Sequence, residues 1–526
     1  MDVITQAPVA PLPSTFGDAL RHHADQRPDG IALRFEGRVT TYAALADYAD
    51  QVANALFAHG LRKGDRIAYL GKNSDHAIEL TLGAARAGIV VVAIIWRLAA
   101  PEIDYILADS GAAMLFVEPA FAAIGDAVSA RGLPTIAMDD QGFAAFRDAA
   151  PARSPAVTVT VTEDDIVLQL YTSGTTGKPK GVMLSHANGI HPRANQIAAG
   201  VDWMLSEPGD TTIIAMPYGH IAGAGAVLGA INSGQELIVH SEFDPGAVID
   251  TVARHHIKRL FLVPAAIAML LRHPRAQGAD FSSIQTLYYG ASPIPLPLLQ
   301  EAVARIGCRF AQLYGMTETW GGVVALPPED HLPGREHKMT AAGKALPGVE
   351  LKIIDADGAA LPPGTIGEIM VRSPSNTPGY WNKPEETAKT VQTDGWLRTG
   401  DAGLLDEEGY LFIQDRIKDM IITGAENVYP AEVESAIYGH PSVADVAVIG
   451  VPDPKWGEAV KAIVVLKPGE PADADAIIAH ARERIAGFKC PKSVDFIDEL
   501  PRNPSGKILR RSLREPFWAG YERRVN

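Results

Sequence analysis

Cysteine and long hydrophobic runs are both scarce in this chain. Cys308 and Cys490 are the only cysteines, and their wide separation argues against a disulfide framework or a metal site and suits a reducing compartment. The longest apolar run, Gly88 to Trp96, is about half a membrane span, and the N-terminal stretch lacks the basic and apolar regions of a secretory signal. We therefore expect a cytoplasmic protein without a transmembrane segment.

Positive charge is scarce as well. The formal net charge is −15, from 47 Lys and Arg against 62 Asp and Glu, and the sequence contains no basic block. This balance argues against electrostatic capture of nucleic acid. An anionic ligand would have to be bound by local groups.

The chain is longer than one hydrophobic core usually supports, so we expect several packed units. Thr41 is placed to cap a helix that ends at Gly60, a strand follows from Arg66 to Leu70, and a second helix from Asp75 to Ala87 leads into a strand over 89–95. Helices and strands that alternate in this way predict an α/β fold with doubly wound parallel sheets.

The secondary-structure pattern of the sequence changes at two points in the rest of the chain. From about residue 340 the pattern is typical of hairpins, with a turn at Asp357 and Gly358, and predicts an antiparallel sheet or small β-barrel-like subdomain. Helices over 430–438 and 473–485, with interspersed strands, predict a compact α+β unit at the end. We therefore predict a large domain over 1–416 and a small C-terminal domain over 417–526.

A segment rich in glycine and threonine follows the strand-like residues 166–171. In TSGTTGKPKG, glycines allow the backbone to approach an anion, while N–H groups, hydroxyls and lysines surround phosphate oxygens. The spacing is not that of a Walker A loop, because Pro179 follows Gly177 and Lys178. The segment alone is compatible with a phosphate cradle or with a flexible surface loop.

Residues 171–181 resemble the signature of the adenylate-forming acyl-CoA synthetases, and further motifs of that superfamily follow in family order. These motifs are YGAS at 289–292, YGMTET at 314–319, GWLRTGD at 395–401, DRIKD at 415–419, ITGAENVYPAEVE at 422–434 and PRNPSGK at 501–507. The resemblance spans nearly the whole chain and is nearest to bacterial fatty-acid and aryl-acid CoA ligases. It implies ATP and CoA as substrates and Mg²⁺ as the metal.

The implied chemistry explains why such motifs are needed. A carboxylate is a poor acyl donor, and joining it to AMP supplies a good leaving group. Attack on the α-phosphorus spreads negative charge in the transition state, so positioning and electrostatic stabilisation should dominate catalysis. The resemblance implies that Lys507, Thr317 and Glu318 are catalytic, and that Glu318 and Thr175 are metal ligands.

The residues that the resemblance assigns to ATP or AMP lie within these motifs. They are Thr172, Ser173, Gly174, Thr175, Thr176, Gly177, Lys178, Lys180, Gly290, Ala291, Ser292, Tyr314, Gly315, Thr317, Asp401, Arg416 and Lys507. Tyr314 is expected to stack on adenine, whereas Asp401 and Arg416 are expected to hold the ribose hydroxyls.

The second half-reaction requires a thiol to enter along a path that Lys507 would obstruct. In this superfamily the C-terminal domain rotates about a hinge residue, which the DRIKD motif places at Lys418, and Gly424 then lines the pantetheine channel. A second glycine is usual at the position of Ala425. Lys489 is either a ligand of a CoA phosphate or a solvated lysine.

The acyl pocket is the part that the sequence specifies least. Its candidate residues are His220, Tyr288, Tyr289, Trp320, Gly321 and Gly322. His220 resembles the family's gate residue, although Gly219 replaces a bulky neighbour and a structural histidine is an equal alternative. Two glycines after Trp320 would open a long channel, whereas the aromatic side chains would form a flat slot for an aryl acid.

We predict an AMP-forming carboxylic acid:CoA ligase that activates a medium- or long-chain fatty acid. The alternatives are a ligase for aryl acids such as cinnamates, an adenylating enzyme that serves a carrier protein, and a non-catalytic nucleotide-binding module. Glu318, Asp401, Arg416 and Lys507 are all present, which argues against the last of these.

Overall fold

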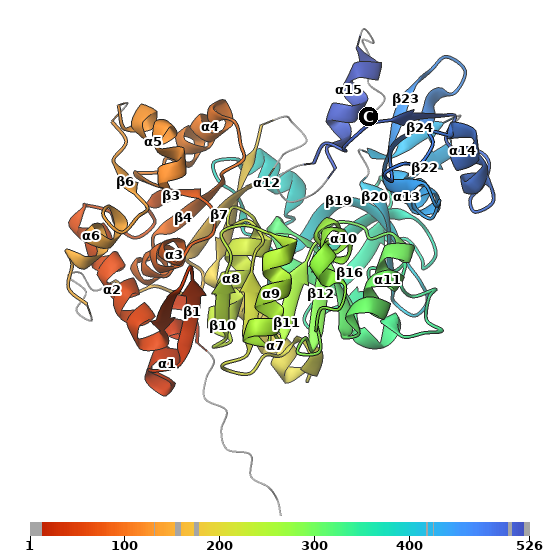
Figure 1. Ribbon diagram of the computed structural model, residues 1–526. Coiled ribbons are helices and arrows are strands. Elements are labelled where there is room, and N and C mark those ends of the chain that lie inside the picture. The colour runs from red at the N-terminus through yellow and green to blue at the C-terminus, as the bar shows by residue number, and fades with distance from the viewer. Residues whose placement is uncertain are drawn as a thin grey trace, which may run out of the picture.

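The computed structural model describes residues 13–130, 132–152, 159–172, 178–416, 419–423, 426–502 and 508–519. Two large sheets and their covering helices form the lower and left parts of the molecule in Figure 1. The C-terminal residues form a smaller unit at the upper right. The predicted α/β class and the small α+β unit at the end of the chain are confirmed.

A seven-stranded sheet has the order β18-β8-β7-β4-β3-β5-β6. Its strands are β3 (Arg66–Gly71), β4 (Val90–Ile95), β5 (Met114–Val117), β6 (Thr135–Ala137), β7 (Ile166–Thr172), β8 (Lys180–Ser185) and β18 (Gly379–Tyr380). Helices from the same part of the chain are α2 (Tyr42–Ala58), α3 (Asp75–Ala87), α4 (Ala100–Ser110), α5 (Ala122–Ser129) and α6 (Phe143–Asp148). The central strands β7, β4, β3, β5 and β6 are parallel, as the alternating pattern predicts.

A nine-stranded sheet has the order β15-β14-β13-β12-β11-β9-β10-β1-β2. Its strands are β1 (Ile31–Phe35), β2 (Arg38–Thr41), β9 (Thr211–Ile214), β10 (Glu236–Val239), β11 (Arg259–Leu262), β12 (Thr286–Gly290), β13 (Arg309–Met316), β14 (Gly321–Leu326) and β15 (Lys344–Ala345). The accompanying helices are α1 (Phe16–Gln26), α7 (His186–Ala198), α8 (Ala226–Asn232), α9 (Pro245–His255), α10 (Pro264–Arg272) and α11 (Leu296–Ile306).

The helix caps read from the sequence are present. Thr41 accepts a hydrogen bond from the N–H of Ala44 at the start of α2, and Gly60 follows the helix in a left-handed conformation. A further cap, which was not among the predicted ones, is Gly88, which ends α3 with a φ of 66°. Capping groups satisfy helix-end N–H and C=O groups locally, so their positions are legible in the sequence.

The hairpin region forms a four-stranded antiparallel sheet with the order β16-β17-β19-β20. Its strands are β16 (Glu350–Ile354), β17 (Gly367–Arg372), β19 (Trp396–Leu405) and β20 (Leu411–Arg416), and α12 (Pro384–Thr390) lies between β17 and β19 in the chain. The predicted turn is present, with Gly358 at a φ of 86°.

The C-terminal unit has its own buried core and its own sheet. Its elements are β21 (Ile421–Thr423), β22 (Glu426–Val428), α13 (Pro430–Tyr438), β23 (Val443–Asp453), β24 (Gly457–Leu466), α14 (Ala474–Arg482), β25 (Ser493–Phe496) and α15 (Arg510–Trp518). The predicted boundary between 416 and 417 and the hinge at Lys418 stay predictions, because residues 417 and 418 lie outside the described residues.

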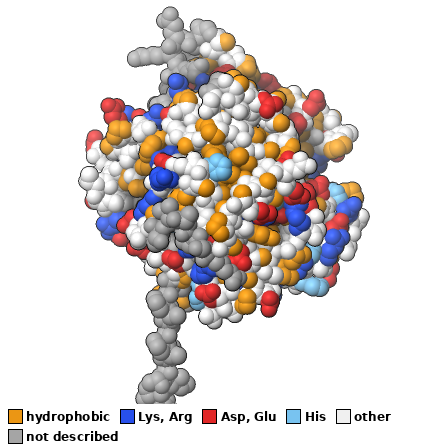
Figure 2. All heavy atoms as spheres, turned by 90° about the vertical axis from the view of Figure 1, so that its left-hand side faces the viewer, with side chains coloured by type: hydrophobic (Ala, Val, Ile, Leu, Met, Phe, Trp, Pro, Cys, Tyr) orange, Lys and Arg blue, Asp and Glu red, His pale blue; other side chains and the backbone are white. Residues whose placement is uncertain are grey.

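Several single turns complete the described chain. They are η1 (Pro119–Phe121), η2 (Asp202–Met204), η3 (Ile221–Gly225), η4 (Pro274–Ala276), η5 (Thr317–Thr319) and η6 (Pro328–His331), of which η3 is a π-helix. Among the described helices, none combines the length and the apolar character that a bilayer span demands. On the face in Figure 2, Lys and Arg side chains lie among Asp and Glu side chains, without a large basic surface among the coloured residues.

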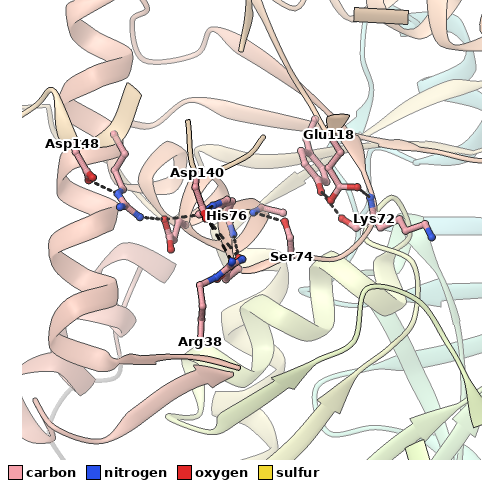
Figure 3. Close-up of polar contacts among 12 residues, drawn as sticks. Arg38, Lys72, Ser74, His76, Glu118, Asp140 and Asp148 are labelled. Atoms are coloured by element: carbon pink, nitrogen blue, oxygen red, sulfur yellow. Dashed lines mark hydrogen bonds and ion pairs between the residues drawn. The ribbon is translucent and has the colours of Figure 1, made fainter. Parts of the chain in front are cut away.

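A network of charges surrounds the start of α3, where the buried His76 lies near Arg38 and Asp140 (Figure 3). Arg38 donates to both oxygens of Asp75, at 2.6 and 2.8 Å, and Arg147 donates to Glu79 at 2.6 Å. Each buried carboxylate therefore has a guanidinium partner, which offsets the cost of removing its charge from water.

His76 should make stability depend on pH. Burial lowers its pKa, but Glu79, Asp75 and Asp140 carboxylates outweigh burial and raise the pKa above its ordinary value. The stabilisation is thus fully present below the unfolded-state pKa of about 6.5 and is lost as pH rises through the folded-state pKa. We expect the urea midpoint of the native chain to fall between about pH 6 and about pH 8, and that of His76→Gln to fall less.

The half-buried His191, which lies 3.1 Å from Glu163, provides the control for this prediction. His191→Gln should keep the pH dependence of the native chain. Parallel urea-midpoint curves for the native chain and for His76→Gln would contradict the prediction.

Candidate active site

Two sheets meet where the predicted nucleotide residues lie. The hydroxyl of Tyr314, on β13 of the nine-stranded sheet, donates to Asp401 Oδ2, on β19 of the four-stranded sheet, at 2.7 Å. Arg416 is the cross-strand neighbour of Asp401 in the β19–β20 register. Three residues of three separate motifs therefore come together at one place.

The glycines of this region are required by close backbone packing. A Cβ at Gly290 would lie 2.1 Å from the carbonyl oxygen of Leu313, and a Cβ at Gly315 would lie 1.7 Å from that of Gly321. Ala291 follows with a φ of 67°, a left-handed conformation that costs a non-glycine residue about 1–2 kcal/mol. Such strain is found at ligand sites, where the surrounding structure holds it. Ser292 is half-buried beside this turn.

Glu318 lies at the entry to the glycine-rich segment. Its residue is only 5 % exposed, and its Oε1 accepts a hydrogen bond from the hydroxyl of Tyr380 at 3.0 Å and from that of Thr172 at 3.4 Å. The N–H of Thr377 donates to the main-chain oxygen of Glu318 at 2.7 Å. Thr317 precedes Glu318 in η5 and is half-buried.

The glycine-rich segment joins two neighbouring strands, because Thr172 of β7 pairs with Lys180 of β8. The predicted phosphate-binding residues Ser173, Gly174, Thr175, Thr176 and Gly177 lie outside the described residues. Lys178 is exposed, with its Nζ 5.5 Å from the ring centre of Tyr105.

Lys180 has a different environment from Lys178. It is 8 % exposed, and its Nζ lies 2.5 Å from a carboxylate oxygen of Glu386 in α12 and 5.0 Å above the ring of Tyr380. The charge of Lys180 is therefore already balanced by a carboxylate in this conformation.

His220 stands at the start of the π-helix η3. Its Nε2 is buried and has no hydrogen-bond partner among the described residues. Burial, assisted by the nearby charge of Arg97, lowers the pKa of His220 to about 4. The imidazole is therefore neutral at pH 7 and holds one buried polar atom that a bound ligand could satisfy.

Trp320 and the glycines after it line the same region. The Trp320 ring stacks on Phe16 with centroids 5.5 Å apart, and Trp320 itself has a φ of 53°. A Cβ at Gly225 of η3 would lie 3.7 Å from Trp320 Nε1, so η3 and Trp320 are neighbours. Gly321 has a φ of 95°, and a Cβ at Gly322 would meet the Leu313 side chain at 3.2 Å.

Two other candidate residues of the acyl pocket are held by hydrogen bonds to the rest of the protein. Tyr289 has no exposed surface, and its hydroxyl lies 3.1 Å from Gln312 Oε1 and 2.9 Å from His331 Nε2. The Tyr288 hydroxyl donates to the carbonyl oxygen of Trp203 at 2.5 Å and accepts from Arg259 at 2.7 Å. Both tyrosines act as packed, hydrogen-bonded residues in this conformation.

Gly219 departs from the bulky residue that the resemblance leads one to expect, and the packing gives the reason. A Cβ at this position would lie 2.8 Å from the main-chain nitrogen of Ile95 and 2.9 Å from its Cα. The segment before His220 therefore packs directly on the backbone of β4, which leaves no room for a side chain at Gly219.

The C-terminal candidates are only partly described. Lys489 binds both carboxylate oxygens of Glu432, at 2.7 and 2.8 Å. Lys418, Gly424 and Lys507 lie outside the described residues, as does Ala425. Of the PRNPSGK motif only residues 501 and 502 are described, and Arg502 forms an antiparallel bridge with Ile508, the residue that follows the motif.

Contacts of Arg272 and Tyr438 are among those that join the large part of the chain to the C-terminal unit. Arg272 at the end of α10 donates to the hydroxyl of Tyr438 at 3.3 Å and to the carbonyl oxygen of Ala444 at 3.0 Å. Tyr438 packs against the core beneath α10 and α11 and also against the C-terminal core. These contacts belong to one relative orientation of the two parts.

Sequence reasoning missed Tyr380 and Thr377. Both lie in the segment NTPGYW, where no periodicity or known motif singled them out. The only local signal is a short apolar pair, Tyr380 and Trp381, between a proline-glycine turn and a charged helix. The contact with Glu318 joins residues 62 positions apart and depends on the β8–β18 pairing.

Comparisons with known proteins agree over almost the entire chain. Residues 20–381 match the family described as AMP-binding enzyme, and residues 432–507 match the AMP-binding enzyme C-terminal domain. The fatty acid–[acyl-carrier-protein] ligase ScoC of Streptomyces coeruleorubidus is 42 % identical, over 98 % of this chain and 99 % of its own length. A feruloyl-CoA synthase of an Amycolatopsis species is 41 % identical, over 94 % of this chain and 97 % of its own.

A solved structure shows the same fold. The crystal structure of ATP-bound MatB from Rhodopseudomonas palustris has a TM-score of 0.86 and 34 % sequence identity, and the match covers 96 % of this chain and all of that one.

Proposed function

The chain belongs to the AMP-binding enzyme family and is an adenylate-forming acid–thiol ligase, and we propose that it converts a medium- or long-chain fatty acid to its CoA thioester. The observation that carries the proposal is the junction of Tyr314, Asp401 and Glu318 beside the glycine-rich segment. This junction offers one aromatic face, one ribose acceptor and one hard carboxylate to a single nucleotide.

In the first half-reaction, the acid carboxylate attacks the α-phosphorus of ATP and pyrophosphate leaves. The ring of Tyr314 stacks on adenine while its hydroxyl stays anchored on Asp401. Asp401 and Arg416 hold the ribose hydroxyls. The backbone and hydroxyls of residues 172–177 surround the phosphates. Lys507 adds positive charge where negative charge develops in the transition state.

The residues around Glu318 fit the magnesium ion that accompanies ATP. A carboxylate and the Thr172 hydroxyl, 3.4 Å from it, are the oxygen ligands that Mg²⁺ prefers. A bound magnesium ion would neutralise phosphate charge. The protein itself holds the Glu318 carboxylate, which lies in η5, in place beside the end of β7.

In the second half-reaction, the sulfur of CoA attacks the acyl-AMP carbonyl and AMP leaves. The hinge at Lys418 lets the C-terminal domain rotate, so that Lys507 withdraws and Gly424 lines the entry path. Rotation breaks the contacts of Arg272 with Tyr438 and Ala444. A CoA phosphate that binds Lys489 would compete with Glu432 for its ammonium group.

In this proposal the acyl chain lies between η3 and Trp320. His220 is neutral, so it offers a hydrogen bond without a charge that would hold the acid as an ion pair. The residues of η3, IAGAG, are apolar and, apart from Ile221, small, and Gly321 adds no side chain opposite. This composition supports an alkyl chain.

Two other functions within the family keep specific support. A flat acid is favoured by the stacked pair Phe16 and Trp320 and by the 41 % identity to a feruloyl-CoA synthase. A carrier protein as thiol acceptor is favoured by the 42 % identity to ScoC. These alternatives differ in the acid and in the acceptor, so one assay separates them.

The test is turnover with ATP against acids from acetate through palmitate to cinnamates, with CoA or a phosphopantetheinyl carrier protein as acceptor. We expect acid-dependent pyrophosphate release and CoA thioesters, with medium or long alkyl acids preferred. Preference for cinnamates would favour the aryl alternative, and thioester on the carrier alone would favour the carrier alternative. Pyrophosphate release that does not depend on any acid would contradict the proposed function.

A further inference from the structure

The segment around β18 holds Glu318 from two directions. The N–H of Thr377 donates to the main-chain oxygen of Glu318, and the hydroxyl of Tyr380 donates to its carboxylate Oε1. Thr172, the last residue of β7, donates to the same carboxylate oxygen. Both the backbone and the side chain of Glu318 are therefore fixed by residues outside its own turn.

Tyr380 is itself rigidly placed. It pairs with Val182 in the β8–β18 register, and the N–H of Trp381 donates to the carbonyl oxygen of Gly181 at 2.8 Å. The Lys180 ammonium lies over its ring and is held by Glu386. Tyr380 is only 7 % exposed, and these contacts hold its ring in place. Its hydroxyl therefore reaches Glu318 from a fixed side chain.

The chemistry of the contact keeps its direction fixed. An ionised carboxylate can only accept hydrogen bonds, so the Tyr380 hydroxyl is the donor in its 3.0 Å contact with Glu318 Oε1. A carboxylate has about four lone-pair sites, so it can accept from Tyr380 and Thr172 and still ligate a cation.

We propose that Tyr380 is a positioning residue that orients the Glu318 carboxylate toward the divalent cation bound with ATP. Groups that hydrogen-bond to a metal ligand fix its orientation, and their removal typically weakens metal binding by about 10–100-fold. The inference rests on the proposed function, because it takes Glu318 as the metal ligand. It adds a residue of the β18 segment, which lies outside the sequence motifs that carry the nucleotide residues.

The test uses the full chain with Tyr380→Phe, which keeps the ring beneath Lys180 and removes only the hydroxyl. Mn²⁺ affinity is measured by electron paramagnetic resonance in the presence of a non-hydrolysable ATP analogue. We expect the affinity to fall by about tenfold or more, with binding of the analogue in the absence of metal changed by less than about twofold. The half-saturating Mg²⁺ concentration for pyrophosphate release should rise in parallel, and excess Mg²⁺ should restore most of kcat.

Tyr410→Phe is the matched control, because the Tyr410 hydroxyl donates to the buried carboxylate of Asp330 at 2.7 Å outside this site. It loses the same kind of hydrogen bond and should leave Mn²⁺ affinity unchanged. Should Tyr380→Phe fail to fold, Thr377→Ala serves as the second variant. It removes the hydroxyl that binds Met183 and Gly379 and should loosen the same segment, with Mn²⁺ affinity falling in the same direction.

Glu318→Gln separates failure of this inference from failure of the proposed function. If Glu318→Gln weakens Mn²⁺ binding but Tyr380→Phe and Thr377→Ala do not, the role of Tyr380 is overturned and that of Glu318 survives. If Glu318→Gln leaves Mn²⁺ affinity unchanged, the metal role of Glu318 fails and the inference fails with it. A loss of analogue binding without metal in Tyr380→Phe would show a general structural role and would also overturn the inference.

Discussion

Lys507→Ala should slow acyl-adenylate formation by roughly a hundredfold or more, while thioester formation from supplied acyl-AMP proceeds at nearly the native rate. The reason is that charge develops on phosphate oxygens only in the first half-reaction, where one lost stabilising group typically costs about 2.7–4 kcal/mol. In the second half-reaction no phosphoryl group is transferred. The two steps are measured by rapid-quench pyrophosphate release and by thioester formation from synthetic acyl-AMP and CoA.

Lys455→Ala is the control for this prediction, since Lys455 is an exposed lysine of the C-terminal unit whose removal should change neither step. Equal losses in both half-reactions for Lys507→Ala would contradict the mechanism in which the C-terminal domain withdraws this lysine. Unchanged adenylation would remove Lys507 from the catalytic group altogether.

Much of the fold follows from local signals. The caps around α2 and both bounds of α3 and α13 were legible, because each depends on residues within one turn of the element. The pairing of β1 with β10 was not legible, since it joins residues about two hundred positions apart. Register between distant strands depends on tertiary packing that local periodicity does not encode.

The site shows the same division between local and long-range information. Tyr314 and Asp401 were identified from motifs, and the structure joins them by a hydrogen bond. The partner of Lys180, by contrast, lies in α12, more than two hundred residues away. The burial of Tyr289 was likewise invisible in the sequence. A motif specifies the residue types at a site, whereas burial and pairing depend on the elements that cover it.

Asp401→Asn should raise the KM for ATP by about a hundredfold. Asparagine keeps the shape of the side chain and can still accept from the Tyr314 hydroxyl, but it replaces one acceptor oxygen by a donor and removes the charge. Hydrogen bonds to a charged group contribute about 1.5–3 kcal/mol each, so losing the two expected with ribose weakens binding by about 3 kcal/mol or more. Each 1.4 kcal/mol corresponds to about tenfold in affinity.

Tyr314→Phe separates the ribose contact from the packing of the ring. It removes the hydroxyl that lies 2.7 Å from Asp401 and keeps the aromatic face that stacks on adenine, so the KM for ATP should rise by about tenfold or less. Adding Tyr314→Phe to the Asp401→Asn enzyme should raise the KM for ATP by a smaller factor than Tyr314→Phe does in the native enzyme, because the two residues share one hydrogen bond. An Asp401→Asn enzyme whose KM for ATP stays within about twofold of the native value would place the ribose elsewhere.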